Sequence, residues 1–248
     1  MNNALNPSLR FLDASQLLSA ASSLDAIHAR TIKVIEHLQR DVEARKTAAA
    51  SRWKGAAGVV SESDRRRLER NEVHAAILEI KRAADKELDA LLKEAGAAHS
   101  AAISQREFYD SPVKTLNRLT LGDARRGEYL RQLEHVGPAE LAHLGQFAVS
   151  TGNVALAAAI VSRLDAMPSG TRPFNGVQLA QAMGIDEHRK GSEAIKIADA
   201  RLQAIVLAIR AWRSGTSNPF DTVQLALRER TLDAGLLEAL EADNGDAR

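Results

Sequence analysis

The chain has 248 residues, of which 45% are hydrophobic and 4% aromatic, with 33 Lys and Arg residues against 32 Asp and Glu residues. This apolar fraction supplies a sizeable core and excludes a wholly disordered chain, and the even charge balance excludes a basic arm for nucleic acid or anionic lipid. The sequence contains no cysteine, which excludes disulfides, thiolate metal sites and a thiol nucleophile.

Alanine and leucine supply most of the apolar surface, and this choice favours helices. Alanine loses no side-chain entropy in a helix, whereas a sheet would favour β-branched and aromatic residues. We therefore expect an all-α fold, with a long antiparallel, coiled-coil-like helical hairpin over residues 13–107 and a compact multi-helix domain over residues 108–242. Residues 1–12 are expected to form an irregular arm, and residues 243–248 a frayed tail.

The first long helix is predicted to start at Asp13, a capping residue with Gln16 three positions later, and to end at about Ala50. Apolar residues recur every seven positions in two interleaved sets, which indicates a heptad seam. The two sets are Leu17, Leu24 and Leu38, and Ala20, Ile27 and Val34. We expect three polar residues to break this seam, namely Thr31, Asp41 and Arg45.

Two glycines, Gly55 and Gly58, follow Trp53 and predict a turn, after which a second long helix is expected over about residues 63–105. Its apolar residues recur about every 3.6 positions, which is the period of a helix with one buried face. This stripe comprises Val73, Ile77, Ile80, Ala84, Leu88, Leu91, Ala95, Ala98 and Ala102. On the other faces, oppositely charged residues four apart predict local ion pairs, Lys81 with Asp85 and Asp89 with Lys93.

The sequence pattern changes from long to short predicted helices near residues 108–112, and Ser111-Pro112 is a typical helix start. From there, closely spaced glycines and prolines divide the chain into short helices. We predict these helices over residues 112–121, 123–135, 138–151, 153–166, 176–184, 187–213, 219–230 and 232–242.

The sequence carries no pattern that points to catalysis. It lacks the His-Glu-x-x-His zinc pattern, the Gly-x-Ser-x-Gly nucleophile turn and a phosphate-binding glycine loop. Glu140 and His143 form one Glu-x-x-His unit, but a di-iron carboxylate site needs two such units and two further glutamates. We therefore expect a non-enzymatic protein with no cofactor and no metal site.

Residues 174–185 resemble the first helix and turn of helix-turn-helix and winged-helix domains. A small residue, Ala180, is followed four positions later by Gly184 and then by the apolar Ile185. The resemblance implies nucleic-acid contact by the basic residues around the following helix, namely Arg172, His188, Arg189, Lys190 and Lys196. The sequence departs from the family pattern at residues 186–191, which are polar where the recognition helix needs core residues.

Two functional hypotheses follow. The leading one is a structural or assembly protein that forms a homo-oligomer through its N-terminal helices, because a lone hairpin of this length leaves apolar surface uncovered. The self-association seam would comprise Leu17, Leu24, Ile27, Val34, Leu38, Val73, Ile77, Ile80, Leu88 and Leu91. The alternative is a DNA-binding regulator or partition-type protein with a helix-turn-helix-like C-terminal domain.

The chain resembles structural proteins of tailed bacteriophages in its overall sequence character, although no diagnostic motif carries the resemblance. The features that it shares with them are an Ala-rich, charged helical N-terminal half, the absence of cysteine and a compact helical C-terminal half. The resemblance implies a neck, portal-associated, scaffolding or internal component that contacts other structural proteins. No apolar run approaches the 18 residues of a membrane span, and the N-terminus lacks a secretory signal pattern. We therefore expect a cytoplasmic protein or one assembled into a virion.

Overall fold

The computed structural model describes residues 11–54 and 59–214, and within these ranges the chain forms α-helices and short 3-10 helices with no strand. This confirms the predicted all-α class. Most of the predicted arm at 1–12, the glycines of the predicted turn, the predicted helices 219–230 and 232–242 and the predicted tail at 243–248 lie outside the described residues.

The chain divides into two units that are each discontinuous in sequence. The compact unit comprises residues 1–19 and 101–196, and the hairpin unit comprises residues 20–100 and 197–248. This differs from the predicted contiguous division at residues 108–112. The reason is the long helix α9, Asp186–Ser214, whose first turns belong to the compact unit and whose remainder belongs to the hairpin unit.

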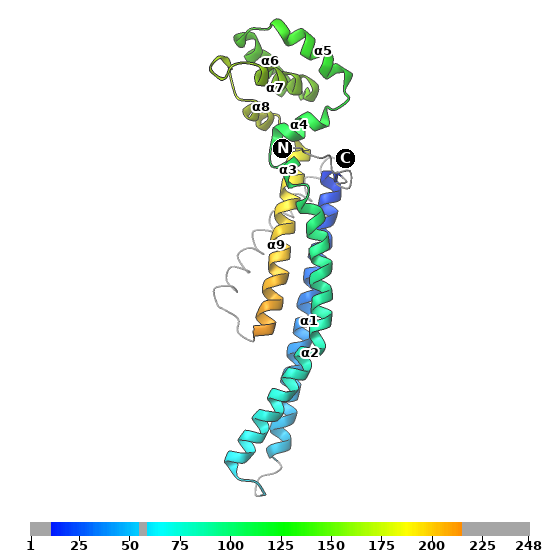
Figure 1. The fold of residues 1–248 in the computed structure, drawn as a ribbon, viewed down its shortest axis with the longest axis vertical. Coiled ribbons are helices and arrows are strands. Elements are labelled where there is room, and N and C mark those ends of the chain that lie inside the picture. Colours follow the sequence, from blue (N-terminus) through cyan, green and yellow to red (C-terminus); the bar gives the residue numbers. More distant parts are fainter. Residues whose placement is uncertain (1–10, 55–58, 215–248) are drawn as a thin grey trace, which may run out of the picture. The chain divides into compact units, whose positions relative to one another are not determined.

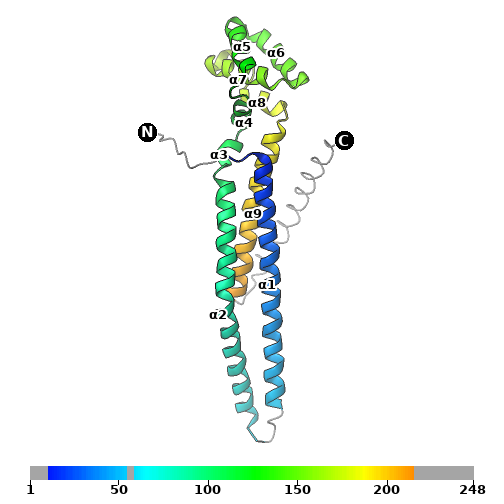
Figure 2. The same ribbon diagram turned by 90° about the vertical axis from the view of Figure 1, so that its right-hand side faces the viewer.

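The hairpin unit is built on two long antiparallel helices, α1 (Ala14–Lys54) and α2 (Glu62–Ile103), as the sequence predicts. Figures 1 and 2 show the two helices side by side, with the C-terminal part of α9 as a third helix beside them. An ion pair of 2.6 Å between Arg30 and Glu94 links α1 to α2. The sequence predicts the pair of helices and a helix over residues 187–213, but not that this helix packs beside the pair.

The buried face of α1 follows a heptad pattern whose spacing alternates between three and four residues. Among its buried positions in the hairpin unit, Ala21, Leu24, His28, Thr31 and Ile35 follow this spacing, and Ile27 and Ala49 are buried as well. Thr31, which was predicted to break the seam, is fully buried within it. Its hydroxyl donates a hydrogen bond to the carbonyl oxygen of Ile27 at 2.9 Å, and this satisfied donor removes the penalty of burying a polar group.

The compact unit consists of short helices arranged around α7 (Val154–Ala166). These are α3 (Arg106–Tyr109), α4 (Pro112–Leu119), α5 (Ala124–Gln132), α6 (Pro138–Thr151) and α8 (Gly176–Ala182), with 3-10 turns at Leu133–His135 and Ser169–Thr171. Helix α7 contacts α4, α5, α6 and α8, and eight of its 13 residues are buried. A helix that is apolar on nearly all sides has to lie in the centre of its domain, which explains this arrangement.

Candidate interaction surface

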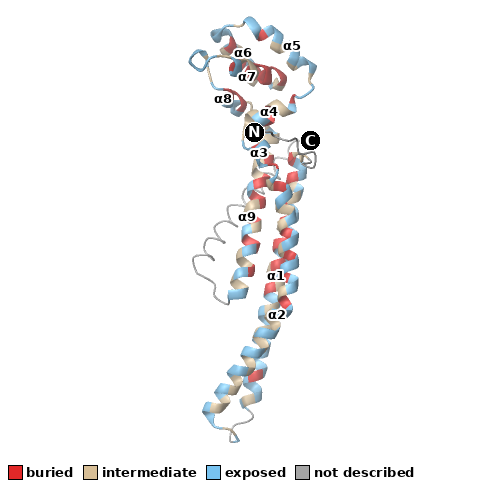
Figure 3. Cartoon of the chain, in the orientation of Figure 1, coloured by how far each residue is buried: buried red, intermediate tan, exposed pale blue. Residues whose placement is uncertain are grey.

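The ten predicted seam residues fall into two sets with different burial. Leu17, Leu24, Ile27, Leu88 and Leu91 are buried, whereas Val34, Leu38, Val73, Ile77 and Ile80 are only partly buried. Figure 3 shows the change along the hairpin, from red residues beside α9 to mainly tan and pale blue residues beyond its end. We call residues 21–35 and 84–100 the covered segment, and residues 36–54 and 62–80 the open segment.

Helix α9 accounts for the burial of the covered segment. Its own buried residues recur at helical spacing and include Ile197, Ala198, Ala204, Ile205 and Ile209. Two polar contacts attach it to both partner helices. Arg201, which is 5% exposed, lies 2.7 Å from Asp25 of α1, and Asp199 lies 2.6 Å from His99 of α2. The covered segment is therefore a three-helix bundle within one chain.

The last turn of α9 is attached to α2 by three polar contacts. The Arg213 guanidinium donates hydrogen bonds to Asp89 at 2.6 Å and Asp85 at 3.1 Å, and the Lys81 ammonium donates to the Arg213 carbonyl oxygen at 2.9 Å. The hydrogen bond that Arg213 donates to Asp89 raises the pKa of Arg213. Lys81, Asp85 and Asp89 were predicted to form pairs within α2, and the structure instead directs them to α9.

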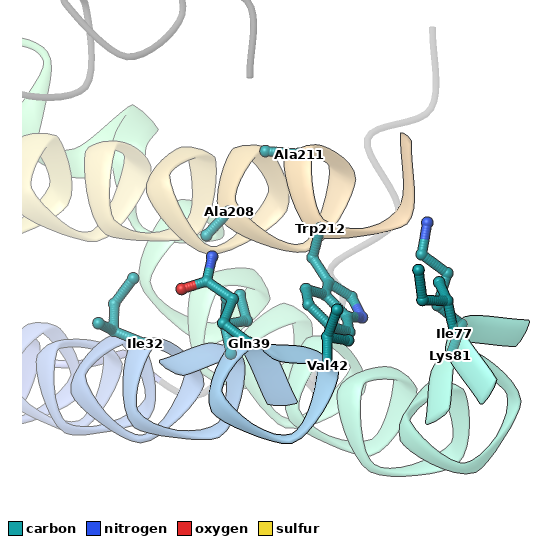
Figure 4. Close-up of a pocket in the computed structure, with 9 residues that line it drawn as sticks. Ile32, Gln39, Val42, Ile77, Lys81, Ala208, Ala211 and Trp212 are labelled. Carbon is teal, nitrogen blue, oxygen red and sulfur yellow. The ribbon is translucent and has the colours of Figure 1, made fainter. Parts of the chain in front are cut away.

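An apolar groove of about 490 Å³ begins where α9 ends. It is lined by residues of all three helices, namely Ile32, Ile35, Gln39, Val42, Ile77, Lys81, Ala208, Ala211 and Trp212. Figure 4 shows the Trp212 indole extending from α9 toward Val42 of α1. The groove lies at the boundary between the covered and open segments and contains a partly buried tryptophan, and aromatic residues are enriched at protein contacts.

Beyond the groove, the open segment has only two described helices to cover its apolar residues. Ala49 is buried there, while Leu38, Val42, Val73 and Ile77 are only partly buried. At the far end, the Trp53 indole N–H donates to a Glu72 carboxylate oxygen at 2.7 Å, and Arg52 pairs with the same carboxylate. Trp53 is therefore held within its own chain and helps to join the end of α1 to α2.

Exposed apolar side chains also gather in the compact unit, where no periodic pattern in the sequence predicts them. Leu119, Leu121 and Phe147 are 48%, 76% and 54% exposed. Leu119 and Phe147 line a shallow hollow together with the turn between α6 and α7 at Gly152. These residues lie at or next to helix ends, where helical periodicity does not distinguish a buried from an exposed leucine.

The predicted helix–glycine–helix corner is present. Helix α8 ends at Ala182, Gly184 adopts the left-handed conformation with φ of +58°, and α9 begins at Asp186. Ala180 is 1% exposed, and Ile185 packs against the core of the compact unit. An L side chain rarely adopts this backbone conformation, so glycine is the residue that allows the turn.

The five candidate nucleic-acid residues do not form one unpaired cationic surface. Arg172 donates to the carbonyl oxygens of Met167 and Asp165, at 3.0 and 3.3 Å, and so serves its own loop. His188 is partly buried, and burial lowers its pKa, which favours the neutral ring. Lys190 is also partly buried.

The two remaining candidates each lie beside a carboxylate on α9. Arg189 is 3.2 Å from Asp186, and Lys196 is 3.4 Å from Glu193. Exposed pairs of this kind are weak, but they offset the local positive charge that a phosphate would need.

A polar cluster in the compact unit lies around Tyr109, within residues 108–112, which the sequence predicts to be a domain boundary. The Tyr109 hydroxyl lies 2.9 Å from a Glu187 carboxylate oxygen, and the Ala14 amide donates to that same oxygen at 2.9 Å. The Tyr109 ring packs against Gly191 so closely that an added Cβ would lie 2.2 Å from it. Burial raises the pKa of Tyr109. This cluster joins the first turns of α1 and α9.

Among the described residues, no group of three or more His, Asp or Glu side chains could hold a metal ion, and no helix is long and apolar enough to cross a membrane. Glu140 and His143 of the single Glu-x-x-His unit are both exposed. Comparisons of the chain with protein-family models, curated proteins and solved structures find no match.

Proposed function

We propose that this protein is a non-enzymatic assembly protein that self-associates through the open segment of its hairpin. The observation that carries the proposal is the row of partly exposed apolar residues beyond the end of α9. Leu38 and Val42 lie seven residues after the buried Thr31 and Ile35 on α1, and Ile77 lies seven residues before the buried Ala84 on α2. A further helix is what buries these positions where α9 is present.

A second copy of the chain is the partner that fits this surface. Two open segments related by a twofold axis would place equivalent apolar residues against each other and form a four-helix section. Full burial of one leucine or isoleucine side chain contributes about 1.5–3 kcal/mol, so burying the exposed parts of these residues in both copies would offset a large part of the cost of association.

The charges that flank the open segment favour a protein partner over nucleic acid. The arginine run at residues 65–67 is followed and preceded by carboxylates, and two of its members are already paired. Arg66 pairs with Glu62, and Arg67 lies 2.9 Å from Asp64. Interspersed charges of both signs suit a helical interface, whose flanking positions exchange ion pairs.

Light scattering on the full-length chain tests self-association. We expect a mass that rises with concentration, and we expect Ile77→Asp to weaken the association at least tenfold, because a charge would be buried without a partner. Leu78→Asp is the matched control, because Leu78 is the next residue and is 41% exposed. Circular dichroism should show equal helix content in both variants. A monomer at every concentration, or equal weakening in both variants, would contradict the proposal.

The resemblance to tailed-bacteriophage structural proteins supplies a setting for this proposal. In a particle, twofold pairs joined through their open segments would be arranged in a larger symmetric assembly, whereas a regulator would remain a simple twofold dimer. Native mass spectrometry distinguishes these two symmetries by the number of chains per assembly.

The second candidate function is DNA binding by the first turns of α9. The corner at Gly184, with Ala180 buried and Ile185 packed on the core, favours it. It predicts that combined Arg189→Ala and Lys190→Ala weaken DNA binding and reduce its salt dependence, with Lys114→Ala as a control in another helix. Failure of the unaltered chain to retard DNA at low salt would exclude this function.

A further inference from the structure

The apolar groove at the end of α9 lies next to a long stretch of the same chain. Ala211 and Trp212 line the groove, and α9 ends at Ser214, two residues after Trp212. The chain then continues for 34 residues, 215–248, which lie outside the described residues. Any segment that follows Ser214 therefore starts at the rim of the groove.

The sequence of this stretch has the composition of a segment that binds to a helical surface. Leucines recur four residues apart at Leu232, Leu236 and Leu240, and the pattern predicts amphipathic helices over residues 219–230 and 232–242. Six further apolar or aromatic residues precede them, namely Phe220, Val223, Leu225, Ala226, Leu227 and Pro219. Such a pattern needs an apolar surface to cover its leucine stripe.

We propose that residues 219–242 bind along the open segment of their own chain and thereby regulate its self-association. This regulation depends on the self-association proposed above, whereas the binding itself does not. The segment would take over the role of α9 where α9 ends: α9 covers Leu24 and Leu88 in the covered segment, and residues 219–242 would cover Val42 and Ile77 at the groove and the apolar positions beyond it.

The length of the segment matches the surface. At 1.5 Å per residue, 24 helical residues reach about 36 Å, and the 19 residues of α1 in the open segment extend over about 28 Å. The short stretch 215–218, which contains glycine and asparagine, precedes Pro219 and suits a turn.

Charge also favours this occupant. Residues 219–242 contain five acidic and two basic residues, whereas residues 36–54 of α1 contain five basic and three acidic residues and residues 62–80 of α2 contain four basic and five acidic residues. The charge balance therefore favours contact with α1, whose five basic residues in this range are all exposed, although Lys46 and Arg52 already pair with Glu43 and Glu72.

The covalent connection favours the chain's own segment over a second copy. A segment attached through a few residues has an effective concentration in the millimolar range at the groove, which exceeds the micromolar concentration of other copies in solution. A second copy would bind only when the segment is displaced. The unaltered chain would then associate weakly, and displacement of the segment would strengthen the association.

Disulfide trapping in the full-length chain tests the binding. The natural sequence has no cysteine, so Val42→Cys can be combined in turn with Val223→Cys, Leu227→Cys and Leu236→Cys without background. We expect at least one pair to form an intramolecular disulfide at least tenfold faster than the same partner forms one with Leu78→Cys on the exposed face of α2. A non-reducing gel separates intramolecular from intermolecular products.

Light scattering on a second full-length variant tests the regulation. The combined substitutions Leu232→Asp, Leu236→Asp and Leu240→Asp should lower the concentration at which the chain associates at least tenfold. The control is Glu238→Gln, on the helix face opposite the predicted leucine stripe, which should leave that concentration unchanged.

The outcomes separate the two proposals. Intramolecular trapping together with stronger association of the aspartate variant supports both. Intramolecular trapping with no association in any variant supports the binding but overturns self-association and its regulation. Predominantly intermolecular trapping means that a second copy occupies the groove, which overturns this inference and supports the proposed function. No trapping in any pair overturns the inference.

Discussion

The covered and open segments of the hairpin continue the same apolar spacing but differ in burial. In the covered segment Leu24 and Leu88 are fully buried, because α9 lies against α1 and α2. In the open segment Leu38 and Ile77 occupy corresponding positions and remain partly exposed. A heptad repeat thus specifies which faces of two helices meet, but it does not specify how many further helices cover the pair.

The difference also shows in the polar contacts at the edge of each segment. The covered segment uses contacts between helices that are distant in sequence, such as Arg201 with Asp25 and Asp199 with His99. In the open segment, most of the ion pairs lie within one helix, as with Lys46 and Glu43. Local pairs contribute little to tertiary stability, so the open segment depends more strongly on whatever covers its apolar face.

The largest expected effect is the difference in the loss of unfolding free energy between alanine substitutions of one leucine and one isoleucine. Leu88→Ala should lower the free energy of unfolding by about 3 kcal/mol, because it removes a fully buried side chain from a three-helix core. Ile77→Ala, in the open segment, should cost about 1 kcal/mol through its contacts with the described helices, which bury it only partly, and more in the monomer when residues 219–242 cover it. Urea unfolding at low protein concentration measures both values. Equal losses would show that the two segments are equally well covered.

A smaller effect is expected from the charged contact between α9 and α1. Arg201→Ala should cost about 2 kcal/mol, because Arg201 is buried and its removal leaves Asp25 without this partner. Arg40→Ala is the matched control in the open segment, where Arg40 is exposed and donates only to the carbonyl oxygen of Glu36 in its own helix. We expect a change below about 0.5 kcal/mol for the control. Comparable losses by thermal or urea unfolding would contradict the assignment of Arg201 to the packing of α9.

The smallest expected effect concerns the end of α9. Arg213→Ala removes the hydrogen bonds to Asp85 and Asp89, all three groups being substantially exposed, so global stability should fall by no more than about 1 kcal/mol. Hydrogen exchange should nevertheless become faster for the amides of the last turn of α9 and remain unchanged at residues 197–205. Added salt should reduce the difference between the variant and the unaltered chain, because it screens exposed charges. Unchanged exchange at the helix end would show that Trp212 and its neighbours hold this turn without Arg213.

Much of the fold follows from local physical chemistry, and those features were predictable. The helical class and the two long helices follow from composition and apolar period. The corner at Gly184 follows from one glycine, and the start of α8 from Asn175, whose side chain accepts from Val177 within a capping box with Gln178. Each of these features depends on residues within about one or two turns of each other, where a spacing in the sequence corresponds directly to a position in space.

Other features depend on residues about 80 to 180 positions apart, and no local spacing encodes them. The return of α9 onto the hairpin redirected Asp85 and Asp89 from predicted pairs in α2 to Arg213. The cluster of Tyr109, Glu187 and Gly191 joins two segments. The sequence predicts a domain boundary for the segment of Tyr109 and a helix surface for the segment of Glu187 and Gly191. An apolar stripe shows that a surface must be covered, but which element covers it depends on competition among all the stripes of the chain, and that competition is resolved only by three-dimensional packing.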